Sequence, residues 1–135
     1  MLFRSADEKD RHERFILTER SNVIPVLIDA KITKQQCINM IMEAGIKVPR
    51  VYEMGYPNAN CIGCVKATSP TYWNLVRETH PLIFDSRARQ SRSIGAKLVR
   101  HKGERIFLDE LPRDAKGRSL ASMDLDCGIF CEERK

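Results

Sequence analysis

The stretch Asn60-Cys61-Ile62-Gly63-Cys64 and its distant counterpart Asp126-Cys127-Gly128-Ile129-Phe130-Cys131 decide how this chain is expected to fold. The first holds a C-x2-C pair and the second a C-x3-C pair. Gly63 permits the tight bend that turns two sulfur atoms toward one ion. Together the pairs predict a zinc site or an iron–sulfur cluster held by Cys61, Cys64, Cys127 and Cys131. The alternative is two separate pairs of buried or reactive thiols.

Length and composition favour one soluble domain spanning residues 1–135. The chain has 135 residues, enough to bury a substantial core. It holds no apolar run of the roughly 18 residues that a membrane span needs, so no membrane partner is expected. The opening Met1-Leu2-Phe3-Arg4 passes at once into charged sequence, unlike a signal peptide. We therefore expect a cytoplasmic protein with reduced cysteines.

The positive charge is concentrated in one segment. The formal net charge is +5, and between Asp85 and Arg105 seven basic residues face two acidic ones, a difference equal to the whole excess. Phosphates, sulfates, nucleic acid or an acidic protein surface are the natural partners of such a patch. The alternative is a solvated basic face. The predicted anion-binding residues are Arg89, Arg92, Arg100 and Lys102.

Local signals predict about four helices. Capping boxes at Ser5–Glu8 and Thr33–Gln36 start helices that run to about Thr18 and to a cap at Gly45. Ser69-Pro70 starts a third helix that reaches His80, and Pro81 starts a fourth that reaches a cap at Gly95. Trp73 and Val76 share a face of the third helix and are expected in the core, as is Cys37 on the second.

Strand signals are fewer. Glycine in Lys102-Gly103-Glu104 predicts a β-hairpin between residues 98–101 and 105–108. The apolar run 23–28 has strand composition, but Pro25 limits it to an edge strand or an extended segment. Leu2-Phe3 resembles the tail of another strand. The expected fold class is therefore α+β: a small single domain of about four helices, a hairpin and short extra strands around the four-cysteine site.

The quoted cysteine pairs, Tyr72-Trp73 and Phe107-Leu108-Asp109-Glu110-Leu111 resemble the phosphoadenosine-phosphosulfate (PAPS) reductase-like family, and most closely its phage and prophage branch. The resemblance covers nearly the whole chain but only the C-terminal half of a usual family member. It implies a remnant of an α/β Rossmann-like fold, and the host-cell cytoplasm as location if the chain is phage-encoded. No loop of the Ser-Gly-Gly-x-Asp-Ser type that holds nucleotide phosphates is present, so the N-terminal nucleotide-binding half is expected to be lacking.

A second departure from the family concerns catalysis. PAPS reductases have a Glu-Cys-Gly-Ile/Leu-His motif with a nucleophilic cysteine, whereas Asp126-Cys127-Gly128-Ile129 is followed here by Phe130. A nucleophilic thiolate needs a cationic neighbour or a helix N-terminus. Loss of the histidine and the nearby Cys131 favour Cys127 as a ligand, and leave it a weak candidate for catalysis. Zn²⁺ and a 4Fe–4S cluster both suit four thiolates; for a standalone chain we expect Zn²⁺, with the cluster as the alternative.

Two functions follow from these observations. The first is a metal- or cluster-binding half of a PAPS reductase-like enzyme, inactive alone and dependent on a nucleotide-binding partner chain. The second is a non-enzymatic protein of phage or mobile-element origin, whose basic segment engages nucleic acid or an acidic host protein, for example of a defence system. The missing phosphate loop argues against catalysis by the isolated chain. It does not distinguish between a non-enzymatic protein and an enzyme whose two halves are separate chains.

Overall fold

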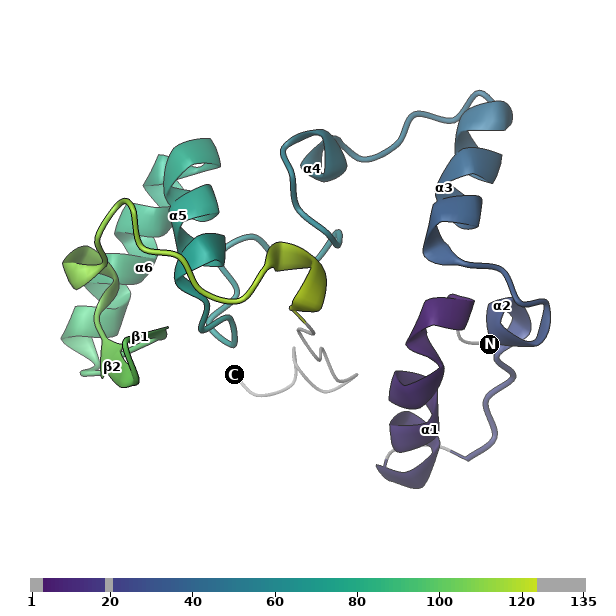
Figure 1. Cartoon of the computed structure of the whole chain (residues 1–135), viewed down its shortest axis with the longest axis horizontal. Coiled ribbons are helices and arrows are strands. Elements are labelled where there is room, and N and C mark those ends of the chain that lie inside the picture. Colours follow the sequence, from purple (N-terminus) through teal and green to yellow (C-terminus); the bar gives the residue numbers. More distant parts are fainter. Residues whose placement is uncertain (1–3, 19–20, 124–135) are drawn as a thin grey trace. The chain divides into compact units, whose positions relative to one another are not determined.

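The structure, a computed structural model, describes residues 4–18 and 21–123 (Figure 1). These residues form an α+β arrangement of helices and one two-stranded antiparallel sheet, as the sequence predicts. The chain divides into two compact units, Met1–Val48 and Pro49–Lys135. Among the described residues, no helix is both long and apolar enough to cross a membrane.

The first unit is built from short helices. A 3₁₀ turn at Ala6–Glu8 leads into α1 (Lys9–Thr18), followed by α2 (Val26–Asp29) and α3 (Lys34–Glu43). The predicted first helix is confirmed, although the Ser5 side chain makes no capping hydrogen bond. The turn and α3 are joined where the Lys34 N–H donates to the Asp7 carboxylate at 2.7 Å.

Both ends of α3 follow the sequence signals. The Thr33 hydroxyl accepts the Gln36 N–H at 3.3 Å, and the Gln36 side chain accepts the Thr33 N–H at 2.8 Å, which completes the predicted capping box. At the other end Gly45 has a φ of 71°, and the Ile46 N–H returns to the Ile41 carbonyl at 3.0 Å. This is a Schellman ending, which requires the left-handed conformation that glycine adopts without strain.

Two expectations for the first unit are wrong. The run 23–28 is no strand, because Val26–Asp29 forms the single helical turn α2. The Pro25 carbonyl accepts the N–H groups of Ile28 at 2.9 Å and of Asp29 at 3.0 Å, so proline stands before a helix. Short apolar runs fit strand and helix equally well, which explains the error. Cys37 is half-buried rather than a core residue, and Leu2-Phe3 lies outside the described residues.

The second unit contains the main hydrophobic core. It comprises α4 (Arg50–Glu53), α5 (Pro70–Thr79) and α6 (Pro81–Ser93), and α5 packs against α6 (Figure 1). Trp73 and Val76 are fully buried, as predicted. The Trp73 Nε1–H donates to the Ala67 carbonyl at 2.8 Å, so the indole satisfies its one polar group inside the core. The Trp73 and Phe84 rings meet edge to face, which joins α5 to α6.

The predicted hairpin is present with shorter strands, β1 (Val99–His101) and β2 (Glu104–Ile106). Glu104, expected in the turn, belongs to β2, whereas Leu108, expected in the strand, begins a 3₁₀ turn. Lys102 and Gly103 have φ angles of 49° and 89°. Positive φ at both central residues marks a type I′ turn, whose twist matches that of the paired strands. Val99 is fully buried, so one face of the hairpin belongs to the core. A 3₁₀ turn at Leu108–Glu110 follows, and another at Leu120–Ser122 leads to Met123.

Candidate functional site: a cysteine turn held by Tyr72

The C-x2-C turn is held by the side chain of Tyr72 from α5. The phenol oxygen accepts the N–H groups of Gly63 at 2.9 Å and Cys64 at 3.2 Å, and its hydroxyl donates to the Cys61 carbonyl at 3.3 Å. A phenol can donate one hydrogen bond and accept two, and Tyr72 makes all three of these bonds to the same short turn. Burial raises the pKa of Tyr72 above its usual value of 10.0, so the hydroxyl remains protonated at neutral pH.

Gly63 meets both a conformational and a steric requirement. Its φ of 71° lies in the left-handed region, and a Cβ there would stand 2.7 Å from Ile83 Cγ2 on α6. The Gly63 carbonyl accepts the Arg87 Nε–H, also from α6, at 3.2 Å. The turn is thus pressed against α6 and hydrogen-bonded to α5. The bend predicted from glycine at this position is confirmed.

The two thiols of the turn differ in exposure. Cys61 is exposed and Cys64 is half-buried, and neither forms a disulfide. Two thiols supply half of a tetrahedral ligand set. Within residues 4–18 and 21–123, no three His, Cys, Asp or Glu side chains form a group that could hold a metal ion. A metal at this turn would therefore need further ligands from outside the described residues, where Cys127 and Cys131 lie.

The last described residue lies close to this turn. Met123 is 7% exposed and, with Tyr56, Asn60 and Tyr72, lines a small pocket beside the cysteine pair. Cys127 follows Met123 by four positions, with three residues between them. A chain of that length spans at most about 14 Å, at about 3.5 Å per residue. The chain therefore continues from Met123, which shares this pocket with Asn60 and Tyr72, toward Cys127, which lies outside the described residues.

A cluster of Tyr56, Thr79 and His80 lies against the Tyr72 ring. The Tyr56 ring meets the Tyr72 ring edge to face, with centroids 6.1 Å apart. The Tyr56 hydroxyl lies 2.7 Å from Thr79 Oγ1, which also contacts His80 Nδ1 at 2.8 Å and donates to the Leu75 carbonyl at 2.7 Å. These residues tie the segment before the cysteines to the end of α5. No sequence motif pointed to them, because their contacts join separate segments.

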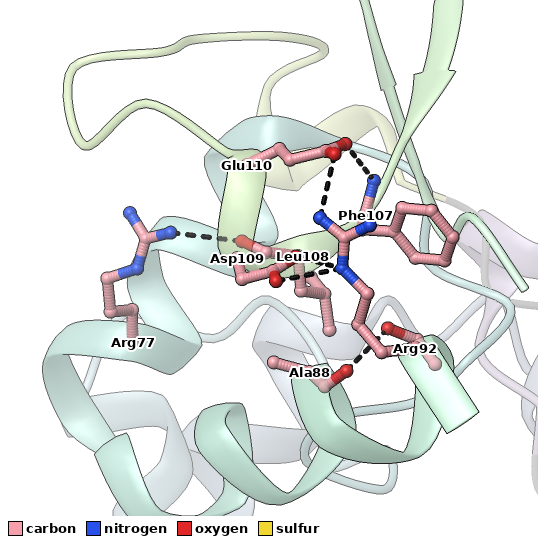
Figure 2. A network of polar contacts seen from close by, with 8 residues as sticks. Arg77, Ala88, Arg92, Phe107, Leu108, Asp109 and Glu110 are labelled. Atoms are coloured by element: carbon pink, nitrogen blue, oxygen red, sulfur yellow. Dashed lines mark hydrogen bonds and ion pairs between the residues drawn. The ribbon is translucent and has the colours of Figure 1, made fainter. Parts of the chain in front are cut away.

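Arg92 is occupied by a contact that the sequence analysis missed. Figure 2 shows its guanidinium between two carboxylates, at 2.9 Å from Asp109 Oδ2 and 2.7 Å from Glu110 Oε1. Its central carbon also lies 3.9 Å from the centre of the Phe107 ring. The Arg92 hydrogen bond is the main cause that lowers the pKa of Asp109. For Glu110 the Phe107 N–H lowers the pKa most, followed by Arg92.

The four residues predicted to bind anions therefore differ in their contacts. Arg92 pairs with Asp109 and Glu110 and fixes the turn after the hairpin to α6. Arg89 lies on α6 and is exposed, whereas Arg100 and Lys102 belong to the hairpin. Within the described part of the chain, Arg89, Arg100 and Lys102 are exposed and take part in no ion pair.

The comparisons with known proteins add no family assignment to this geometry. The resemblance to the PAPS reductase-like family rests on the quoted residues. Of these, Cys61 and Cys64 are hydrogen-bonded to Tyr72, whose ring contacts Trp73. The Phe107–Leu111 run forms the separate contact with Arg92. The family membership stays a prediction, since no family model, no curated protein and no solved structure matches this chain.

Proposed function

We propose that this chain is a metal- or cluster-binding domain of the PAPS reductase-like type, in which Cys61, Cys64, Cys127 and Cys131 hold one Zn²⁺ or one 4Fe–4S cluster. The observation that carries the proposal is the Cys61–Cys64 turn, fixed by the Tyr72 phenol and lying beside Met123, from which the chain continues to the second cysteine pair. Among the described residues, neither thiol is joined in a disulfide, so both are available as ligands.

The turn suits a metal for a physical reason. A metal held by four thiolates requires one backbone geometry at its ligands. If the loop that carries them were flexible, the cost of ordering it would reduce the free energy of metal binding. Here three hydrogen bonds to Tyr72 and the contact of Gly63 with α6 order the turn beforehand. A zinc ion at this place would stabilise the fold, and a cluster would add redox chemistry. Either would require the four thiols to lose their protons.

In a PAPS reductase-like enzyme this chain would hold the metal or cluster, and another chain would bind the nucleotide. Sulfonucleotide chemistry needs several phosphate oxygens held in place, for which successive backbone N–H groups at a helix start are suited. The seven glycines of this sequence form no such loop. A nucleotide-binding partner chain would supply it, and Cys127 would serve as a ligand rather than as a nucleophile.

The metal content of purified chain tests the first part of the proposal. We expect one zinc ion per chain, or an absorption band near about 400 nm if a cluster is bound. Cys61→Ser and Cys127→Ser should each lose the metal and the cooperative thermal transition together, because metal binding contributes directly to folding. Cys37→Ser is the matched control and should keep both, since Cys37 lies on α3 outside the quartet. A Cys127→Ser chain that keeps the metal and a full transition would contradict the proposal.

Activity assays test the second part. The purified chain is incubated with ATP, and separately with PAPS plus thioredoxin as reductant. No turnover is expected, because the chain has no loop to hold the phosphates in line with the reacting atom. Turnover above about 1 s⁻¹, at the low end for enzymes, without an added polypeptide would contradict the dependence on a partner chain.

A further inference from the structure

The β1–β2 hairpin places two arginines directly opposite each other. Arg100 and Arg105 are register partners, one position beyond the His101–Glu104 pair that flanks the two-residue turn. In a hairpin with such a turn the flanking pair exchanges backbone hydrogen bonds and the next pair does not. The Arg100 N–H accordingly donates to the Thr68 carbonyl at 2.9 Å. In pairs of this kind the two Cβ atoms lie only about 4.5–5.5 Å apart.

Nothing in the described structure neutralises this pair. Like charges directly opposite each other destabilise a sheet. Among the described residues, neither Arg100 nor Arg105 takes part in an ion pair. Glu104 is one position from Arg105 along β2 and therefore on the opposite face, because successive side chains alternate. The Arg105 guanidinium donates to the Leu98 carbonyl at 3.0 Å, which leaves most of its donors available.

The hairpin holds these charges on a rigid support. Its other face belongs to the core, where Val99 is fully buried. The hydrogen bond from Arg100 to Thr68 ties β1 to the segment that leads into α5. Lys102 stands in the turn, where its side chain is exposed, and β1 contacts α5. The strand pairing therefore keeps the backbone positions of the two arginines directly opposite each other.

We propose that this face of the hairpin binds the phosphate backbone of nucleic acid through Arg100 and Arg105, with Lys102 contributing from the tip. The guanidinium fork matches phosphate geometry, and an anion between the two arginines would replace repulsion with two attractions. Protein interfaces are built around aromatic and apolar anchors. The apolar members of this hairpin, Val99 and Ile106, lie on the other face, so phosphates fit this surface better than an acidic protein.

A salt titration tests the assignment, and it is independent of the metal proposal. Full-length chain, with any metal it carries, is titrated into fluorescein-labelled duplex DNA of arbitrary sequence at several salt concentrations. For Arg100→Gln/Arg105→Gln the slope of log K against log salt should become shallower by about 1.8, because two phosphate contacts are lost. The thermal midpoint should stay equal or rise, since the like-charge pair is removed. Arg100→Lys/Arg105→Lys should keep the slope of the parent.

Lys116→Gln/Arg118→Gln is the matched control, because it removes two exposed charges from the same unit outside the hairpin. Its slope should equal that of the parent. The proposal is overturned if the Arg100/Arg105 variant keeps the parental slope, or if the control loses as much. It is also overturned if polyglutamate displaces the DNA more effectively than unlabelled duplex does, since the partner would then be an acidic polypeptide.

Discussion

Gly63→Ala is expected to weaken metal binding and to destabilise the second unit by about 2–5 kcal/mol, the combined cost of a left-handed backbone for alanine and of overpacking. The new Cβ would stand 2.7 Å from Ile83 Cγ2, so either the turn or α6 must shift. A shift of the turn would lengthen the hydrogen bonds from Gly63 and Cys64 to Tyr72. Urea unfolding and metal stoichiometry measure the two effects.

Two further variants separate the steric effect from the conformational one. Gly55 has a φ of 86° and open space where its Cβ would be, so Gly55→Ala should show only the conformational cost and keep the metal. Gly63→Ala combined with Ile83→Ala removes the clashing methyl group and should recover part of the metal binding. Equal stability losses at Gly63 and Gly55, with metal retained at both, would show that the contact with α6 does not position the cysteines.

Trp73→Ala should be the most destabilising single change in the second unit, with a loss of about 3–5 kcal/mol. The side chain is fully buried, contacts the rings of Tyr72 and Phe84, and donates to the Ala67 carbonyl. Domains of ordinary stability unfold at a cost of about 5–15 kcal/mol, so this change removes a large part of the total.

Circular dichroism at increasing urea concentration measures this effect without relying on tryptophan fluorescence. Leu82→Ala on α6 is the control, because Leu82 is 82% exposed and should change the free energy of unfolding by no more than about 0.5 kcal/mol. If Trp73→Ala costs no more than Leu82→Ala, the core is not centred on the indole as described.

The elements that the sequence predicted correctly are those with local signals. Proline stands at the first position of both α5 and α6, and Gly95 follows the end of α6 with a φ of 70°. Lys102-Gly103 forms the turn of the hairpin. These residues act through their own backbone preferences, so their effect does not depend on what the rest of the chain does.

What the sequence did not reveal depends on contacts between distant segments. The C-x2-C spacing and Gly63 predicted the bend, but nothing in the pattern showed that Tyr72 would hold it. Arg92 was counted as an available cation because its pairing with Asp109 and Glu110 joins segments 17 and 18 residues apart. Composition gives the number of charges in a segment, whereas only the fold determines which of them are already paired.

The hydrogen bonds to the Tyr72 hydroxyl also couple opening of the cysteine turn to movement of α5. A loop held only by its own residues can fluctuate open at little cost, whereas one bonded to a core helix opens together with that helix. The backbone N–H groups of Gly63 and Cys64 both donate to the phenol oxygen of Tyr72. The ring of Tyr72 is buried and contacts the rings of Tyr56 and Trp73. A molecule that binds the two thiols and displaces the turn must therefore also disturb the packing of these aromatic rings. The turn moves with the core rather than as an independent loop.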